Sequence, residues 1–312
     1  MAFLTPQNFH LSLPVRFFFN FFLYSFFLNC FIFIFIFIFF QGLRTDDDPK
    51  LWEEYRKERQ KLLDDKLIKY QTMICEKFNY PLSTTKNIFP VSSFLNLIQY
   101  PEELSYEDIE ELPSNFLRVD TFIRFETEAF EIPKELSSKM KVGDKLIYLS
   151  LGSMGCCNLK LMRRLIKILG KTSHFYIVSK GVLGDQYTLA DNMWGSKKVP
   201  QTKVLPLVDL FITHGGNNSL MESFYFGKPV IIFPQFYDQF DNGSRVQEKN
   251  YGYSFNHNDF TDEDLLNAIE KMLTDQELIK KYQKMSERIQ KENRADKVCA
   301  EIEQRLKKYK KI

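Results

Sequence analysis

A histidine, two glycines and a short polar run follow an apolar stretch in the segment 208–242, VDLFITHGGNNSLMESFYFGKPVIIFPQFYDQFDN. His214, Gly215 and Gly216 come first, and residues 217–219 then open a stretch of helical spacing. Two glycines allow a tight turn and let a ligand approach the backbone closely. The unpaired N–H groups at a helix start, together with the positive end of the helix dipole, attract an anion. The turn is therefore a candidate phosphate-binding site.

The elements around this turn are expected to alternate between strand and helix. Nearly continuous apolar runs predict strands at 145–151, 175–179, 208–213 and 230–234, and apolar periodicity predicts helices at 159–169, 219–226 and 242–249. Such an order predicts an α/β, Rossmann-like parallel sheet with helices on both faces. Ligands of open α/β sheets bind outside the carboxyl ends of the strands, and the turn at 214–216 falls at such an end.

Two simpler interpretations of the same residues stay open at this point. Ser219 and Glu222 have the spacing of a capping box, in which both side chains serve only to start a helix. His214 could be a packed core histidine without a role in binding.

Taken together, the segment resembles the signature of the UDP-glycosyltransferases, glycosyltransferase family 1 of the GT-B fold. The matching residues are Pro200, Gln201, Phe211, Ile212, Thr213, His214, Gly215, Gly216, Asn218, Ser219, Glu222, Gly227, Lys228, Pro229, Pro234, Asp238, Gln239 and Asn242. An upstream stretch, 150–153, is similar to the first loop of the family's donor domain, and the resemblance covers roughly residues 92–285. The chain most resembles invertebrate members without a C-terminal membrane tail.

The resemblance implies a role for each matching residue. His214, Asn218 and Ser219 would face the diphosphate, with Gly216 and Ser153. Glu222 would hold the ribose hydroxyls, Asp238 and Gln239 would read hydroxyls of the transferred sugar, and Gln201 would line the uracil side. The implied reaction is inverting and metal-free, and it uses no cofactor because the UDP-sugar is a co-substrate. The helix dipole and the charge of His214 would stabilise the departing diphosphate.

Two departures from the family pattern change the expectation. The family commonly has Trp two residues before the Pro-Gln pair, whereas this chain has Lys198, with Trp194 four residues earlier as a candidate replacement. The family also carries a catalytic His base in an N-terminal acceptor domain, and general-base catalysis needs such a group within reach of the acceptor. Upstream of residue 145 the chain has only His10, in no matching motif. His174 and His257 are expected to be surface or packing residues.

The first part of the chain is unusual in composition. Thirteen of the 31 phenylalanines lie between Phe17 and Phe40, in an uncharged window long enough to cross a bilayer as a helix. A membrane anchor is one interpretation. Strict Phe-Ile alternation at 31–39 instead has a strand period, and a non-native or unstructured leader is the alternative. The location stays uncertain, with a cytoplasmic donor domain, anchored or free, as the default.

Charge and cysteine usage exclude several classes. With 42 basic and 40 acidic residues, the net charge of +2 argues against a nucleic-acid binder. Five cysteines without metal spacing suggest neither a disulfide framework nor a zinc site. We therefore expect four regions: a leader, 1–45; a remnant of an acceptor domain with the linker, 46–140; a UDP-sugar donor-binding domain, 141–285; and a charged C-terminal helix, 286–312.

The functional expectation is a hexosyltransferase that uses a UDP-sugar and a small lipophilic acceptor. Because most of the acceptor domain is missing from the sequence, the chain alone is expected to have little activity. A UDP-sugar-binding pseudoenzyme, or the donor half of a split transferase, is the alternative. A dehydrogenase nucleotide domain is disfavoured because no G-x-G-x-x-G follows the strand at 145–151.

Overall fold

A computed structural model describes residues 48–62, 68–79, 92–105 and 111–309 of the chain. Within these ranges no helix is both long and apolar enough to cross a membrane. The Phe-rich leader, residues 1–45, lies outside the described residues.

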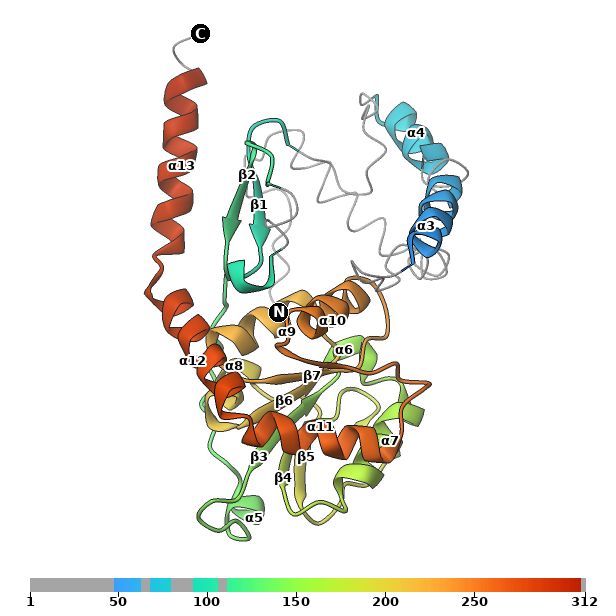
Figure 1. Cartoon of the computed structure of the whole chain (residues 1–312), viewed down its shortest axis with the longest axis vertical. Coiled ribbons are helices and arrows are strands. Elements are labelled where there is room, and N and C mark those ends of the chain that lie inside the picture. Colours follow the sequence, from blue (N-terminus) through green and yellow to red (C-terminus); the bar gives the residue numbers. More distant parts are fainter. Residues whose placement is uncertain (1–47, 63–67, 80–91, 106–110, 310–312) are drawn as a thin grey trace.

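A six-stranded sheet forms the centre of the described residues (Figure 1). Its strands are β3 (Leu146–Ser150), β4 (Phe175–Ser179), β5 (Met193–Ser196), β6 (Leu210–Thr213), β7 (Val230–Ile232) and β8 (Gly252–Ser254). They are all parallel, in the spatial order β5-β4-β3-β6-β7-β8. The order reverses direction between β3 and β6, which are direct neighbours. In sheets of this kind, ligands bind at such a switch point.

Helices cover both faces of this sheet. The connection from β3 to β4 runs through α7 (Leu159–Leu169), and that from β6 to β7 runs through α9 (Asn217–Tyr225). The two connections move in opposite directions along the sheet. Because crossovers between parallel strands are right-handed, their helices lie on opposite faces. The α/β, Rossmann-like fold predicted from the sequence is confirmed.

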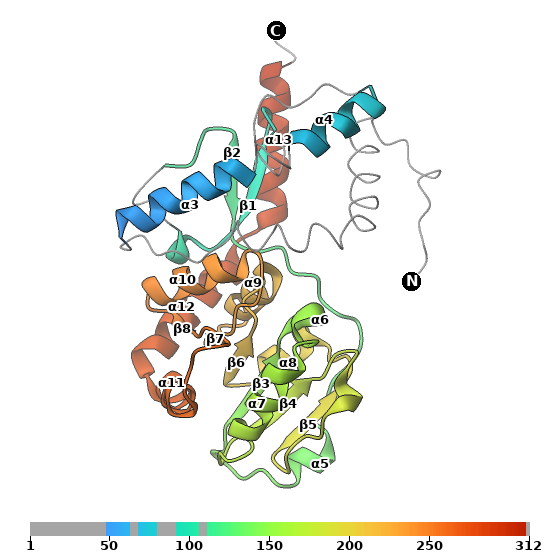
Figure 2. The same cartoon turned by 90° about the vertical axis from the view of Figure 1, so that its right-hand side faces the viewer.

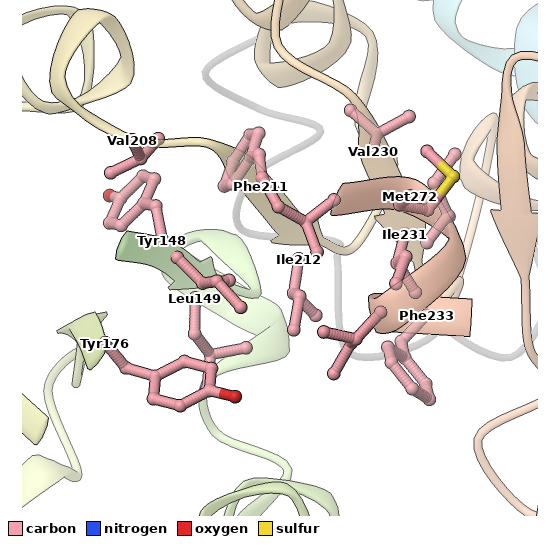
Figure 3. Close-up of a cluster of buried hydrophobic side chains, with 14 of the residues drawn as sticks. Tyr148, Leu149, Tyr176, Val208, Phe211, Ile212, Val230, Ile231, Phe233 and Met272 are labelled. Carbon is pink, nitrogen blue, oxygen red and sulfur yellow. The ribbon is translucent and has the colours of Figure 1, made fainter. Parts of the chain in front are cut away.

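Buried apolar side chains make up most of the core of the sheet (Figure 3). Every residue of β3, β6 and β7 is buried. Tyr148 and Phe211, from neighbouring strands, stack with their ring centroids 4.9 Å apart. Burial of a large apolar side chain stabilises a fold by about 1.5–3 kcal/mol relative to exposure. The rigid carboxyl edge on which the site depends therefore rests on these strands.

Further helices belong to the part of the chain around the six-stranded sheet. They are α5 (Lys134–Ser137), α6 (Gly152–Gly155), α8 (Gln201–Val204), α10 (Gln239–Glu248) and α11 (Asp262–Thr274), with single 3₁₀ turns at 184–186 and 205–207. A capping box starts α11: the Thr261 hydroxyl accepts from the Asp264 N–H, and the Asp264 carboxylate accepts from the Thr261 N–H. The sequence analysis did not identify this cap.

A second, smaller unit stands above the sheet beside the C-terminal helices (Figures 1 and 2). Two parallel strands, β1 (Asn96–Gln99) and β2 (Phe116–Val119), pair with each other, and the 3₁₀ turn η3 (Glu102–Leu104) follows β1. Helices α12 (Gln276–Lys291) and α13 (Arg294–Tyr309) run from the part around the six-stranded sheet to this unit. We refer to β1, β2 and η3 as the β1–β2 unit.

Three arginines attach the β1–β2 unit. Arg288 of α12 binds Asp120 through two hydrogen bonds of 2.7 and 3.0 Å, and Glu103 through two of 2.8 and 2.6 Å. Arg305 of α13 donates to the carbonyls that precede the two strands, those of Phe94 and Ser114. Arg245 of α10 lies over the Tyr100 ring, 4.4 Å from its centroid, at a distance typical of a cation–π contact.

Several predicted bounds differ from the structure. The apolar stretch 119–125 contains only the last residue of a strand, because β2 ends at Val119. Helix α9 begins two residues before the predicted start, and α10 three residues before it. The charged region 50–70 contains most of α3 (Pro49–Leu62) and the first residues of α4 (Ile68–Lys77), with 63–67 between them not described. The helical break near the C-terminus falls at 292–293, whereas the predicted boundary at 285/286 lies inside α12.

Candidate donor-binding site

His214 lies between two glycines at the switch point of the sheet. It follows β6, and its ring packs on Gly152, which follows β3. A methyl group at Gly152 would come within 2.8 Å of the His214 Nε2, and one at Gly216 within 2.5 Å. Gly152 also has a φ of +72°, which L side chains rarely adopt. The glycines therefore let the imidazole sit where the two loops meet.

Burial controls the charge of His214. It lowers the pKa of His214 to about 4, although a backbone hydrogen bond with Ser150 acts in the opposite direction. The ring is therefore neutral near pH 7 in the ligand-free chain. The charge of His214 beside a diphosphate stays a prediction; in the ligand-free chain the imidazole is a neutral hydrogen-bonding group. Its Nδ1 is 3.3 Å from the Thr213 hydroxyl.

Gln201, Ser219 and Glu222 are brought together from two elements. The Gln201 Nε2, at the start of α8, lies 2.6 Å from the Glu222 Oε2 and 3.2 Å from the Ser219 hydroxyl, both on α9. Burial raises the pKa of Glu222, the Gln201 hydrogen bond lowers it, and the charge of Glu126 raises it further. A half-buried carboxylate with one oxygen held by an amide keeps acceptor capacity for hydroxyl groups.

The capping-box interpretation of Ser219 and Glu222 is wrong. Helix α9 begins at Asn217 with Gly216 as its N-cap, and neither Ser219 nor Glu222 caps it. Ser219 therefore lies inside the first turn, and its hydroxyl meets Gln201 rather than a helix N–H. Neither side chain is needed to start the helix, so both stay available for another role.

The side chain of Asp238, in the loop before α10, accepts a hydrogen bond from the start of α9. Its Oδ2 accepts from the Asn217 N–H at 3.0 Å and from the Asn242 Nδ2 at 2.9 Å. The same Asn242 nitrogen donates to the Gly215 carbonyl at 2.9 Å. Burial raises the pKa of Asp238, and the hydrogen bonds from Asn217 and Asn242 lower it. The first N–H of the helix is thus already taken, which leaves those of Asn218 and Ser219 for an anion.

Gln239 is buried and holds the loop 234–239 in shape. Its Oε1 accepts from the Gln235 N–H at 2.9 Å and from the Phe236 N–H at 3.1 Å. Tyr237, in the same loop, has a φ of +58°, which is uncommon for a residue other than glycine. The side-chain oxygen of Gln239 is therefore used within the protein, and its nitrogen is the part left for a sugar.

Ser153 and Asn218 are exposed residues at the edges of the same region. Ser153 is the second residue of α6, next to the Gly152 on which His214 packs. Asn218 is the second residue of α9, one position after the N–H that Asp238 occupies. The predicted diphosphate residues thus lie at two neighbouring helix starts, those of α6 and α9.

The linker before β3 docks onto α8. Glu126 Oε2 accepts from the backbone and hydroxyl of Thr202, at 2.9 and 2.7 Å. Trp194 lies in β5 with its ring 5.9 Å from that of Phe130 of the linker. Trp194 therefore lies in a paired strand and packs against the linker, and it is not in a loop that could bend toward the uracil base. The contacts of the linker were not predicted from the sequence. A role for Gln235 was not predicted either.

The remaining described histidines have structural partners. His174 is buried and lies 2.8 Å from Glu270 of α11. His257 Nδ1 lies 3.1 Å from the Pro234 carbonyl. No group of three or more metal-ligating side chains is found among the described residues.

Comparisons with known proteins agree with this geometry. The family model described as UDP-glucoronosyl and UDP-glucosyl transferase matches residues 127–295. NDP-glycosyltransferase YjiC of Bacillus subtilis (strain 168) is 33% identical over 166 residues, which cover 52% of this chain and 42% of that protein. Human UDP-glucuronosyltransferase 1A9 is 38% identical over 89 residues, 28% of this chain and 17% of that protein. The chain therefore spans less than half the length of these relatives.

Solved structures show the same fold. The glycotransferase of kitacinnamycin aligns with a TM-score of 0.65 at 19% identity, over 81% of this chain and 67% of that one. CalG4, the calicheamicin glycosyltransferase, aligns with a TM-score of 0.63 at 15% identity, over 85% and 65%.

Proposed function

Because this chain belongs to the UDP-glucoronosyl and UDP-glucosyl transferase family, we propose that it binds a UDP-sugar as the donor half of a hexosyltransferase. The reaction would transfer the sugar to a small lipophilic acceptor, with inversion and without a metal. The observation that carries the proposal is the position of His214, packed between Gly152 and Gly216 where the two central strands end. A diphosphate placed there would meet N–H donors from both loops.

Three groups of described residues would each contact a different part of the UDP-sugar. Glu222, held by Gln201, is suited to accept hydrogen bonds from the two ribose hydroxyls. The His214 ring and the N–H groups at the start of α9 would hold the diphosphate. Asp238, fixed by Asn217 and Asn242, would lie beyond it, toward the sugar.

The neutral state of His214 fits a role in the departure of UDP. A neutral imidazole with a low pKa binds a diphosphate as a hydrogen-bond donor and gains charge-assisted strength as negative charge develops on the leaving oxygen. Because the ring and helix start are already in place, this stabilisation needs little rearrangement during the reaction.

One observation favours the alternative that this chain binds a UDP-sugar but does not transfer the sugar by itself, either as a pseudoenzyme or as the donor half of a split enzyme. Each described histidine has a structural partner or packs at the position proposed for the diphosphate: His174 with Glu270, His257 with Pro234, and His214 between the glycines. No imidazole among the described residues is thus left to activate an acceptor hydroxyl. We expect the full chain alone to show little or no glucosylation of a phenol; robust transfer would exclude this expectation.

Calorimetric titration of the full chain with UDP tests the donor site. We expect binding, and Glu222→Ala should weaken it by about 1–3 kcal/mol because a hydrogen bond to a charged group is lost. Glu287→Ala, on an exposed position of α12, is the matched control and should leave the affinity unchanged. An unchanged UDP affinity for Glu222→Ala would refute the assignment of Glu222.

A further inference from the structure

Gln235 has a buried hydrogen-bond donor that the protein does not use. The residue is 6% exposed, and its side-chain Nε2 has no hydrogen-bond partner among the described residues. Buried polar groups are nearly always paired, so an unpaired one calls for a physical reason. Gln235 belongs to the loop 234–239, next to the candidate sugar residues.

The orientation of the Gln235 amide follows from its neighbour. Asn158 caps α7, and its Oδ1 accepts from the Leu161 N–H at 3.1 Å. The Nδ2 of Asn158 is therefore the atom that faces Gln235, 3.2 Å from the Gln235 Oε1. A donor there requires an acceptor, so the oxygen of Gln235 points to Asn158 and its nitrogen points elsewhere.

The backbone of Gln235 is also held. Its N–H donates to the Gln239 Oε1 at 2.9 Å. A side chain fixed at both its backbone and its oxygen loses little further freedom when its nitrogen gains a partner.

The place of this nitrogen along the site indicates which part of the donor it would meet. His214 packs on Gly152, the first residue of α6, whereas the Gln235 Nε2 packs on Gly155, its last residue. At about 1.5 Å per residue, these positions lie about 4.5 Å apart along the helix. The Gln201–Glu222 pair, suited to the ribose, is held on α8 and α9 rather than on α6. The order is thus nucleoside, diphosphate and then the group attached to the diphosphate.

We propose that the Gln235 Nε2 donates a hydrogen bond to a hydroxyl oxygen of the transferred sugar, an inference that rests on the proposed function. In the ligand-free chain this nitrogen is shielded from solvent. Its use therefore requires the loop 234–239 to shift from α6 as the sugar enters, and the left-handed backbone of Tyr237 lies in that loop. Gln235 thereby discriminates UDP-sugars from UDP.

Titration of the full chain with UDP-glucose and with UDP tests this role. Gln235→Met keeps the length of the side chain and removes the donor. It should weaken UDP-glucose binding about five- to tenfold, the effect of one hydrogen bond, and change UDP binding less than twofold. Gln247→Met makes the same change on an exposed position of α10 and should alter neither affinity. Gln235→Leu replaces the first variant if thermal unfolding shows that it does not fold.

The outcomes separate this inference from the proposed function. Equal loss of UDP and UDP-glucose affinity would place the contact on the diphosphate and overturn the sugar assignment. Unchanged affinities would indicate a nitrogen satisfied by an internal water, which also overturns it. If the unmodified chain binds no UDP, the proposed function fails and this inference fails with it.

Discussion

The donor half and the β1–β2 unit both contain parallel strands, yet different forces hold them. Strands β3, β6 and β7 are buried at every position, between helices on both faces. In the β1–β2 unit, Leu97 is 46% exposed, and the attachment runs through Arg245, Arg288 and Arg305. Parallel sheets normally require cover on both faces. The comparison shows that guanidinium groups can add to the apolar contacts of Tyr100 and Leu104 in holding a small parallel pair.

The largest effect is expected from removing core volume in the donor half. Ile212→Ala, in the centre of β6, should lower the free energy of unfolding by about 2–5 kcal/mol, because a buried side chain leaves a cavity. Leu97→Ala in β1 should cost less than about 1 kcal/mol because Leu97 is already half exposed. Urea unfolding followed by circular dichroism measures both, and similar losses would contradict the comparison.

The next effect concerns the ionic attachment. Arg288→Met leaves Asp120, which is 4% exposed, without its bidentate partner. Burial tends to raise the pKa of Asp120, and the Arg288 hydrogen bonds hold it below its usual value. We expect a local loss of about 1–3 kcal/mol. Hydrogen exchange should quicken in β1 and β2 but not in β3 or β6; faster exchange throughout would show that the two parts unfold together.

The third effect is the pH dependence of stability that His214, in the polar loops above the core, is expected to cause. Because the folded pKa of His214 is about 4, below the unfolded value of about 6.5, its contribution to stability is complete above pH 6.5. It is lost as the pH falls from 6.5 to 4, by up to about 3 kcal/mol. His214→Gln should flatten this part of the stability curve, measured by urea unfolding at pH 7 and pH 5. An unchanged slope would show that the ring is not neutral in the folded chain.

The smallest effect lies at a helix start remote from the site. Thr261→Ala removes the cap of α11 and should cost about 1 kcal/mol. Ser219→Ala, at the position that is not a cap, should leave the midpoint of thermal unfolding nearly unchanged while weakening UDP binding. A larger stability loss for Ser219→Ala than for Thr261→Ala would restore the capping interpretation.

The sequence predicted most of the donor sheet because its central strands are apolar runs that require burial. It did not predict β5 or β8, since MWGS and GYS carry little apolar pattern and pair only through their neighbours. The apolar stretch 119–125 does not continue the paired strand for a related reason. Its apolar residues Phe122 and Phe125 are about half exposed and lie outside the paired strand, which ends at Val119.

For the site, the resemblance supplied the residues and the structure supplied their relations. Gln201 and Glu222 lie 21 residues apart, and their 2.6 Å contact depends on how α8 and α9 pack. The low pKa of His214 depends on burial between two glycines from different loops. Neither property is encoded locally. The unpaired nitrogen of Gln235 likewise becomes visible only when Asn158 fixes the amide.

The attachment of Arg305 has a consequence for synthesis on the ribosome. The carbonyl of Ser114 is bound by a side chain 191 residues later in the chain. At about 5–20 residues per second, roughly 10–40 s pass between the appearance of the two groups. During that interval β1 and β2 exist without the helix that holds them, while the donor sheet can already assemble. The attachment of the β1–β2 unit through Arg305 therefore forms only after α13 has been synthesised.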